Sequence, residues 1–474
     1  MSTTVNVRKL ALEALLAVER DGRQSHLVIR DILQEQKGLP LRERAFFTRL
    51  TEGTIEYRLQ LDHVLDQFLR EPAAKTKPVV LEILRMAVYQ ILYMDSVPDR
   101  AAVHEAVALA EEKGLSGLKG FVNGVLRMVV RKKDELDWPD PRTEPDRALS
   151  VRYSVPVETV RVWKERYGAD LTERICASFL EDRPLTVRMI RSAADGGKTG
   201  SIPEELIVSH ILERACFLRE GAELTRMGAF RGGRIYVQDL SSQIAVVSAG
   251  IRPGDRVLDL CAAPGGKSLL AAELAACEEE WTAAEDMSEA DRRGACGKGA
   301  ILARDISEQK TALIRENCVR CRAENVRAEA ADAAVFDPAL EEQFDVVIAD
   351  LPCSGFGICG RKPEIKYKPY RETVTALAEL QRSILPNAVR YVRPGGRLLY
   401  STCTISREEN EDNVRWLLDT FPLRPADLRE LLPKGVRELP EAQRSLRTAP
   451  DGYVQLLPCD GPWDGFFFAV LVKE

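Results

Sequence analysis

The chain of 474 residues is too long for a single hydrophobic core, so two or three domains are expected. Its composition, 45% hydrophobic and 30% charged, is that of a globular protein, and no apolar run approaches the ~20 residues that span a bilayer. The net charge of -6 argues mildly against non-specific nucleic-acid binding, although residues 1–133 carry more basic than acidic side chains.

The N-terminus and the cysteines indicate a cytoplasmic protein. The first apolar stretch is brief, is broken by Glu13 and lacks a small-residue cleavage site, so a signal peptide is not expected. The chain has 11 cysteines, scattered and odd in number, which suits reduced thiols better than a disulfide framework.

Residues 1–133 are predicted to form an all-helical bundle. Apolar side chains recur at i, i+3/4 and i+7 in residues 80–91 and again in residues 118–129, which is the pattern of a helix facing a core. Short polar or proline-containing breaks at 38–40 and 96–98 separate the segments.

The next two segments are expected to be a linker and a small module. Residues 134–145 are charged and proline-rich, which is typical of a linker. Residues 146–235 mix amphipathic helices with a strand-like piece at 185–190 and a glycine turn at 195–197, and are predicted to form a small α/β module.

Residues 236–474 are predicted to form a doubly wound, Rossmann-like α/β domain, because short apolar strands alternate with helical stretches. The apolar tail 465–472 is expected to close the sheet, and the acidic insert 277–297 to form a solvated surface loop. The strands that carry this prediction are residues 257–260, 300–303, 344–349 and 397–400.

The first chemical motif is Arg256-Val-Leu-Asp-Leu-Cys-Ala-Ala-Pro-Gly-Gly-Lys-Ser268. An apolar strand, a glycine turn and a helix in this order bring backbone amides and a helix N-terminus close to a cofactor, although such a turn alone is often ordinary architecture. A phosphate-binding P-loop would need glycine at position 261, where this chain has cysteine, and the dinucleotide pattern G-x-G-x-x-G is absent.

Two further motifs each place a cysteine just past the end of a strand. They are Asp350-Leu-Pro-Cys-Ser-Gly355 and Tyr400-Ser-Thr-Cys-Thr404. The carboxyl ends of strands in an open parallel sheet form the side where ligands bind, so two thiols are expected beside the cofactor. A lone cysteine is more often a small buried hydrophobic residue, and these two are distinguished by the motifs around them.

Two aspartates follow other strands of the predicted sheet. Asp305 follows the second strand, where an acidic residue usually binds ribose hydroxyls, and Asp332 lies after the next strand-like stretch, within reach of an adenine. An exposed loop aspartate is the simpler interpretation of either residue.

The set of motifs resembles the Sun/nucleolar-protein family of RNA cytosine-C5 methyltransferases over residues 150–474. The N-terminal bundle is similar to the RNA-binding antitermination fold called NusB, a pairing of domains found in the bacterial small-subunit ribosomal RNA branch of the family. Besides the motifs above, the resemblance rests on Tyr236-Val-Gln-Asp-Leu-Ser-Ser-Gln243, Glu408-Glu-Asn410 and Asp464-Gly-Phe-Phe467.

The resemblance implies a reaction that uses S-adenosyl-L-methionine. By the family pattern Cys403 is the nucleophile that adds to C6 of cytosine, and Cys353 helps to remove the C5 proton before release. Asp350 would bind the base edge near N3, and Lys267 would favour the thiolate. The cofactor would contact Cys261, Ala262, Ala263, Pro264, Gly265, Gly266, Lys267, Asp305, Asp332 and Asp350.

A basic stretch, residues 360–368, follows the second motif. Its cations are expected to grip RNA phosphates while the target base is extruded, and a solvated loop is the alternative. The cations are Arg361, Lys362, Lys366 and Lys368.

No metal is expected. Cys318 and Cys321 have zinc-ligand spacing, but they lie in a helical stretch without a second ligand pair. Two departures from the family pattern, Leu351 and Phe356, are expected to reshape the base pocket without removing a catalytic group.

The leading interpretation is methylation of one cytosine in 16S ribosomal RNA by a monomeric enzyme. A transfer RNA cytosine is the alternative substrate, and a non-catalytic RNA-binding or assembly factor the alternative class. A DNA cytosine methyltransferase would use the Pro-Cys thiol and would have no need of Cys403.

Overall fold

The computed structural model describes residues 6–191, 201–276 and 299–474. The chain forms two compact units, a helical unit of residues 1–181 with 359–370, and a sheet unit of residues 182–358 with 371–474. The expected turn at 195–197 and the expected acidic loop at 277–297 lie outside the described residues. The domain boundaries predicted at 133, 145 and 235 stay predictions.

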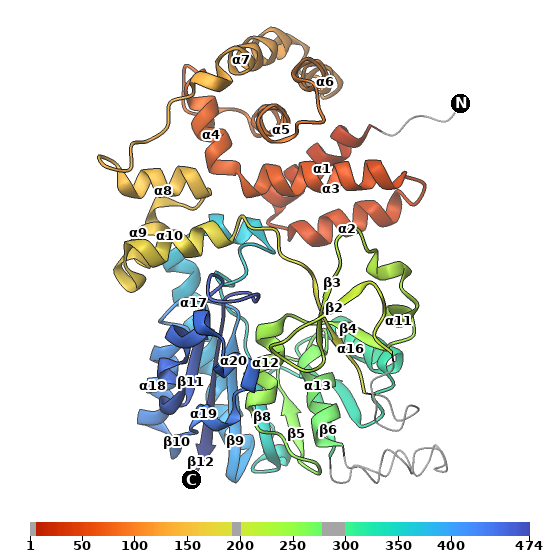
Figure 1. The fold of residues 1–474 in the computed structure, drawn as a ribbon, viewed down its shortest axis with the longest axis vertical. Coiled ribbons are helices and arrows are strands. Elements are labelled where there is room, and N and C mark those ends of the chain that lie inside the picture. Colours follow the sequence, from red (N-terminus) through yellow and green to blue (C-terminus); the bar gives the residue numbers. More distant parts are fainter. Residues whose placement is uncertain (1–5, 192–200, 277–298) are drawn as a thin grey trace. The chain divides into compact units, whose positions relative to one another are not determined.

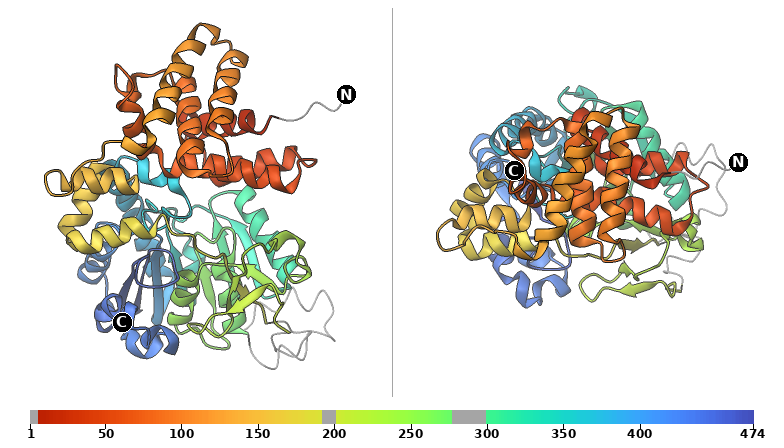
Figure 2. Two further views of the ribbon diagram at one scale, coloured as in Figure 1. Left: turned by 45° about the horizontal axis from the view of Figure 1, so that its top comes forward. Right: turned by 90° about the horizontal axis from the view of Figure 1, so that it is seen from above.

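The helical unit contains a bundle whose helices, red to orange in Figure 2, pack around one apolar core. The side chains of Val80, Ile83 and Val125, which carried the sequence periodicity, are all buried in it. The helices are α1 (Val7–Asp21), α2 (Ser25–Glu35), α3 (Leu41–Glu56), α4 (Arg58–Asp66), α5 (Pro78–Tyr93), α6 (Asp99–Glu112) and α7 (Lys119–Lys132), followed by α8 (Pro145–Tyr153), α9 (Val157–Tyr167) and α10 (Ala169–Ser178).

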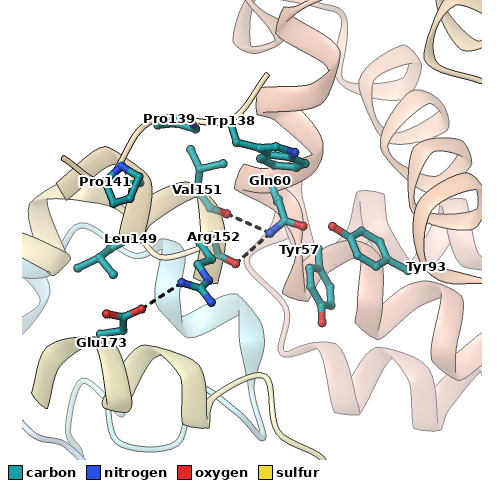
Figure 3. A pocket seen from close by; sticks show the side chains of 11 residues that line it. Tyr57, Gln60, Tyr93, Trp138, Pro139, Pro141, Leu149, Val151, Arg152 and Glu173 are labelled. Carbon is teal, nitrogen blue, oxygen red and sulfur yellow. Dashed lines mark hydrogen bonds and ion pairs between the residues drawn. The ribbon is translucent and has the colours of Figure 1, made fainter. Parts of the chain in front are cut away.

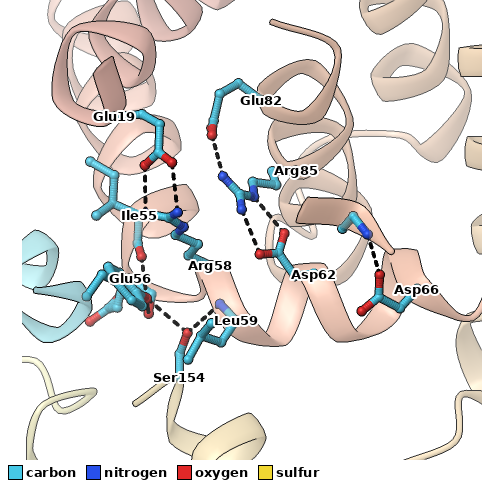
Figure 4. Close-up of polar contacts among 12 residues, drawn as sticks. Glu19, Ile55, Glu56, Arg58, Leu59, Asp62, Asp66, Glu82, Arg85 and Ser154 are labelled. Atoms are coloured by element: carbon cyan, nitrogen blue, oxygen red, sulfur yellow. Dashed lines mark hydrogen bonds and ion pairs between the residues drawn. The ribbon is translucent and has the colours of Figure 1, made fainter. Parts of the chain in front are cut away.

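Helix α5 lies inside the bundle and is buried on nearly every side, so its charged side chains need partners. Figure 4 shows the solution: Arg85 donates to both carboxylate oxygens of Asp62, at 2.6 Å each, and to Glu82. The bidentate geometry satisfies the guanidinium, so α5 stays buried without an unpaired charge.

The sheet unit is built on one large mixed sheet with the strand order β10-β12-β9-β8-β5-β6-β7, and β11 pairs with β12 (Figure 1). Strands β9, β8, β5, β6 and β7 are parallel, and β12 runs antiparallel between β9 and β10. The bounds are β5 (Val257–Asp259), β6 (Ile301–Asp305), β7 (Val326–Ala330), β8 (Phe344–Asp350), β9 (Val392–Thr402), β10 (Leu423–Pro425), β11 (Tyr453–Leu456) and β12 (Phe466–Lys473).

Helices cover both faces of this sheet, so successive strand residues are buried on opposite sides. Val257 and Val346 pack in one apolar cluster with α12 and α13, whereas their neighbours Leu258 and Val347 pack in another with α17 and α18. The predicted doubly wound α/β fold is therefore confirmed. The helices are α12 (Leu240–Ser248), α13 (Gly266–Ala275), α16 (Glu308–Cys321), α17 (Tyr370–Tyr391), α18 (Glu411–Thr420), α19 (Leu428–Leu431) and α20 (Lys434–Arg437).

A smaller antiparallel sheet precedes the large one, with the order β2-β3-β1-β4. Its strands are β1 (Thr186–Met189), β2 (Leu206–Val208), β3 (Ala215–Leu218) and β4 (Ile235–Val237), with α11 (Gly228–Arg231) before β4. Across the described ranges, the helices are all too short or too polar to cross a bilayer.

Candidate active site

The sequence motifs meet at one edge of the large sheet. Strands β5, β6, β8 and β9 are parallel neighbours, so the residues that follow their carboxyl ends lie side by side. The edge therefore collects a glycine turn after β5, Asp305 at the end of β6, the Asp350–Cys353 segment after β8 and Cys403 after β9.

The segment 261–266, the cofactor loop, joins β5 to the N-terminus of α13. Gly265 has φ +106°, a conformation that side chains rarely adopt, and it starts the helix directly. The Asp305 carboxylate accepts the amides of Ala263 (3.0 Å) and Ile306 (2.8 Å) and pairs with Lys310 (3.1 Å). Asp305 thus fixes the cofactor loop to the end of the neighbouring strand.

Asp259 lies buried at the base of this loop. One carboxylate oxygen accepts the hydroxyl of Ser268 at 2.6 Å, and the other has no hydrogen-bond partner among the described residues. Burial raises the pKa of Asp259 to about 7.

The donors and acceptors at this edge fit an S-adenosylmethionine-type cofactor. The first amides of α13 have no partner within their helix, which suits an anionic group such as a carboxylate. Asp305 keeps acceptor capacity for hydroxyls beyond its present bonds, and one oxygen of Asp259 has no partner among the described residues.

The two motif cysteines are in contact. The sulfurs of Cys353 and Cys403 lie 3.2 Å apart, and the amide of Cys403 donates to the Cys353 sulfur at 3.3 Å. Both side chains are half-buried, and Cys403 also packs against an apolar cluster of the sheet unit. The contact between two sulfurs at a strand end distinguishes this pair from the fully buried cysteines.

The Cys353 thiol ionises less readily than an ordinary thiol. The hydrogen bond to Cys403, burial and the negative charge of an ionised Cys403 raise the pKa of Cys353 well above its ordinary value. Cys353 therefore keeps its proton in this arrangement.

Asp350 and Lys267 form an ion pair beside the thiols. The Lys267 ammonium lies 2.6 Å from one carboxylate oxygen of Asp350, and the hydroxyl of Ser401 donates to the other at 2.7 Å. Burial disfavours the charged form of Lys267, but Asp350, Asp259 and an ionised Cys403 outweigh it and raise the pKa of Lys267. The lysine is thus a cation held in place by Asp350.

Two residues that the sequence suggested only as part of a motif hold the cysteine segments together. Glu409 accepts the amide of Ser354 at 2.8 Å and its hydroxyl at 2.5 Å, next to Cys353. Asn410 bonds the hydroxyl of Thr402 at 2.6 Å and the carbonyl of Thr404 at 3.1 Å, on either side of Cys403. In the sequence, the only indication that these two residues matter was their position in the motif Glu408-Glu-Asn410. The motif did not indicate what either side chain does.

The remaining predicted cofactor residues make fewer polar contacts with the rest of the site. Cys261 packs partly into the apolar core, and burial raises its pKa. The Pro264 carbonyl accepts from Asn317 at 3.0 Å, which links the cofactor loop to α16. Asp332 is exposed just past β7, and its carboxylate accepts the amide of Ala334 at 2.9 Å.

The basic stretch 360–368 requires one correction. Lys366 is fully buried, and its ammonium donates to the carbonyl of Glu56 at 2.9 Å, so it faces no RNA phosphate in this fold. Lys368 is exposed, whereas Arg361 and Lys362 are partly buried. The predicted RNA contacts are thus reduced to Arg361, Lys362 and Lys368.

Cys318 and Cys321 lie on α16 and are buried in an apolar cluster with Ile314 and Leu269. The parts of the chain that the structure describes contain no group of three or more side chains suited to hold a metal ion.

Two family models match separate parts of the chain. The NusB family matches residues 5–131, and the family described as 16S rRNA methyltransferase RsmB/F matches residues 295–472. A Bacillus subtilis protein named probable ribosomal RNA small subunit methyltransferase B is 33% identical over 474 residues, 99% of each chain. Its Cronobacter sakazakii counterpart, ribosomal RNA small subunit methyltransferase B, is 27% identical over 488 residues, covering 100% of both.

Solved structures share the fold. The crystal structure of PH0851 covers 100% of both chains with a TM-score of 0.76 and 22% identity. A methyltransferase homologue from Pyrococcus horikoshii covers 71% of this chain and 100% of its own, with a TM-score of 0.52 and 23% identity.

The fold and these relationships define a methyltransferase with a NusB-type helical domain at its N-terminus. The chain belongs to the 16S rRNA methyltransferase RsmB/F family, which confirms the resemblance drawn from the motifs.

Proposed function

We propose that this protein methylates C5 of one cytosine in 16S ribosomal RNA, with Cys403 as the nucleophile. The proposal is carried by the Cys353–Cys403 contact of 3.2 Å beside the Asp350–Lys267 ion pair. Two thiols in contact, one of which has a raised pKa, suit a reaction that needs one nucleophile and one proton-handling group.

The Cys403 thiolate adds to C6 of the cytosine, which makes C5 a nucleophile because the ring becomes an enamine. Lys267 stabilises the thiolate before it adds. Asp350, fixed between Lys267 and Ser401, accepts a hydrogen bond from N3 of the base, which becomes protonated as the thiolate adds to C6. After methylation a base takes the C5 proton with the help of Cys353. The electron pair of the broken C5–H bond then forms the C5–C6 double bond, and the Cys403 sulfur leaves C6 as a thiolate.

S-adenosyl-L-methionine supplies an electrophilic methyl group when bound at this edge. We assign the cofactor loop and the N-terminus of α13 to its amino-acid portion, Asp305 to its ribose hydroxyls and Asp332 to its adenine, with Lys267 and Asp350 bordering the methyl group.

The other partners are proposed on the same basis. Arg361, Lys362 and Lys368 contact RNA phosphates, and the binding partner is small-subunit ribosomal RNA. The protein works as a monomer in the cytoplasm, and light scattering of the purified protein checks the monomeric state.

The decisive experiment incubates the full chain with methyl-labelled S-adenosylmethionine and unmodified 16S ribosomal RNA, with transfer RNA in parallel, and maps 5-methylcytosine. We expect label at a single ribosomal cytosine. Cys403→Ala should abolish transfer, Cys353→Ala should accumulate a denaturation-resistant protein–RNA adduct, and Cys459→Ala, a half-buried cysteine outside both motifs, should behave as wild type.

Label in transfer RNA alone would replace the proposed substrate. Adduct formation by Cys403→Ala together with its loss in Cys353→Ala would reverse the two cysteine roles.

A further inference from the structure

A cavity of about 520 Å³ opens within the helical unit, and no residue that lines it belongs to the active site described above (Figure 3). Its volume lies in the range of sites that hold small organic groups. The lining residues are Tyr57, Gln60, Tyr93, Trp138, Pro139, Pro141, Ala148, Leu149, Val151, Arg152 and Glu173.

Flat aromatic and proline surfaces form much of the wall. The rings of Tyr57 and Tyr93 stack with their centroids 4.5 Å apart and an interplanar angle of 25°. The Trp138 indole is 44% exposed, which is a large apolar surface to leave in contact with water. Such a wall favours a flat, unsaturated occupant.

The segment that carries Trp138 is held in place by side chains at the C-terminal end of α4 and just past it. The backbone of Asp137 donates its amide to Gln67 and accepts from the Gln67 amide group, both at 3.0 Å. The His63 ring nitrogen lies 2.8 Å from the Asp137 carbonyl, and the His63 and Trp138 rings are 5.5 Å apart. These contacts position the indole at the cavity before any ligand binds.

Gln60 adds a fixed polar group to this wall. The residue is 8% exposed, and its amide nitrogen donates to the carbonyls of Val151 (3.2 Å) and Arg152 (2.9 Å), as Figure 3 shows. These two bonds fix the orientation of the amide, and among the described residues no group donates to its oxygen. The cavity therefore presents one accessible acceptor that an N–H donor can reach.

We propose that this cavity binds one unpaired nucleobase of the RNA substrate, a role that rests on the proposed function. The base lies against the aromatic wall, and its exocyclic amine or ring N–H donates to the Gln60 oxygen. Arg152 lies at the cavity with its side chain 69% exposed and pairs with Glu173 at 3.2 Å. Because an exposed ion pair is weak, Arg152 can exchange Glu173 for a backbone phosphate.

The test measures binding of the full-length protein to two single-stranded probes by fluorescence anisotropy. One probe is an adenosine oligomer of about 12 nucleotides, and the other has the same length and charge but carries abasic ribose. Trp138→Ala should weaken binding of the adenosine probe about 5- to 100-fold and leave the abasic probe unchanged.

Two further variants separate stacking from general damage. Trp138→Phe keeps an aromatic face and should retain most of the affinity. Phe121→Ala removes a comparably exposed aromatic, 41% against 44%, from α7 outside the cavity and should bind as wild type. Equal losses for both probes, or wild-type binding by Trp138→Ala, would overturn the nucleobase assignment; in the second case a peptide becomes the better occupant.

Methyl transfer to 16S ribosomal RNA by the wild-type protein is measured separately. If the wild-type protein transfers methyl groups but Trp138→Ala does not weaken adenosine binding, only the proposal for the cavity is overturned. If Trp138→Ala weakens adenosine binding but the wild-type protein does not methylate 16S ribosomal RNA, the proposal for the cavity is supported and the proposed substrate is overturned.

Discussion

At the residue scale, Glu409 shows how a side chain that touches neither thiol can decide the geometry of both. Its carboxylate bonds the amide and hydroxyl of Ser354 and the amide nitrogen of Gln381, and burial raises its pKa. The hydroxyl of Ser354 also lies 2.8 Å from that of Thr404, which follows Cys403. Glu409 is thus a positioning residue for the two cysteine segments.

Glu409→Ala should lower kcat for methyl transfer about 10- to 100-fold with a small change in KM, because the Ser354 amide loses its acceptor and the Cys353 segment shifts. Glu409→Gln should restore most of the activity, since a glutamine can accept from the amide and donate to the hydroxyl. Steady-state kinetics check both variants. Glu408→Ala, at the exposed neighbouring position, is the matched control, and equal kinetics for the two alanine variants would contradict the role.

Asp259 predicts a pH dependence of stability. Its pKa is raised in the folded protein from the ordinary 3.8 to about 7, so the folded state binds more protons than the unfolded state between these values. The stabilising contribution is therefore complete below about pH 4 and is lost as the pH rises through about 7, on the order of 1 kcal/mol per pH unit.

Asp259→Asn removes this dependence, because an amide is neutral at every pH and still accepts from Ser268. The variant should gain stability relative to wild type as the pH rises from 4 to 8. Urea unfolding across this range checks the prediction. A constant difference between the two proteins would show that Asp259 does not titrate in this window.

At the element scale, the segment after β8 and the turn before β12 approach so closely that only glycine fits. The amide of Gly357 donates to the Cys403 carbonyl at 3.1 Å, and the amide of Gly465 donates to the Gly357 carbonyl at 2.9 Å. A Cβ atom on Gly357 would lie 2.1 Å from the Gly465 carbonyl oxygen. The contact joins the ends of β8 and β9 to the start of β12 beside Cys403.

Gly357→Ala should destabilise the sheet unit by about 1–3 kcal/mol, because the added methyl group meets backbone on two sides. Calorimetry and methyl transfer should both report the damage. Gly124→Ala in α7 adds a methyl group into open space and should be neutral or slightly stabilising. Equal stability of both variants would mean that the backbone near Gly357 relaxes freely.

The strands that the sequence predicted are those with continuous apolar runs, such as β8 and β12. The edge strand β7 alternates apolar and charged residues and is only partly buried, and β10 has three residues ending in proline, so neither has a buried-strand pattern. The tail was expected to close the sheet, but β12 lies inside it with β10 and β11 beyond. Strand order depends on tertiary packing, which local periodicity does not encode.

The site was predictable where a motif carried it and not where distant segments meet. Cys353 and Cys403 were expected near each other because both follow strands of one parallel sheet. The burial of Lys366 was not foreseeable, because its acceptor lies 310 residues earlier in the chain. A charged residue in a charged stretch gives no sign of such a partner.

At the scale of the whole molecule, structural units do not follow chain order. Residues 359–370, just past the Cys353 motif, fold with the N-terminal helices and complete two helix ends. Glu364 accepts the amide of Ser25 at 3.1 Å and its hydroxyl at 2.7 Å at the start of α2. At the end of α3, the Tyr367 hydroxyl and the Lys366 ammonium donate to the last carbonyls of the helix. The negative charge at the start of α2 and the positive charge at the end of α3 both complement the helix dipoles.

Tyr367→Phe tests this arrangement with the loss of one oxygen atom. The hydroxyl donates to the carbonyls of Ile55 (2.7 Å) and Glu56 (3.0 Å), and it lies 3.0 Å from the hydroxyl of Ser154. Without it the Ile55 carbonyl loses a buried side-chain donor, so the helical unit should lose about 1–3 kcal/mol of stability.

Hydrogen exchange should locate that loss at the end of α3, some 300 residues from the substitution, while the large sheet keeps its protection. Lys368→Ala, at an exposed position of the same segment, should stay within about 0.5 kcal/mol of wild type. If Tyr367→Phe instead loosened only its own segment and left α3 protected, the bond would restrain the segment without stabilising the helix, and the N-terminal helices would be stable independently of it.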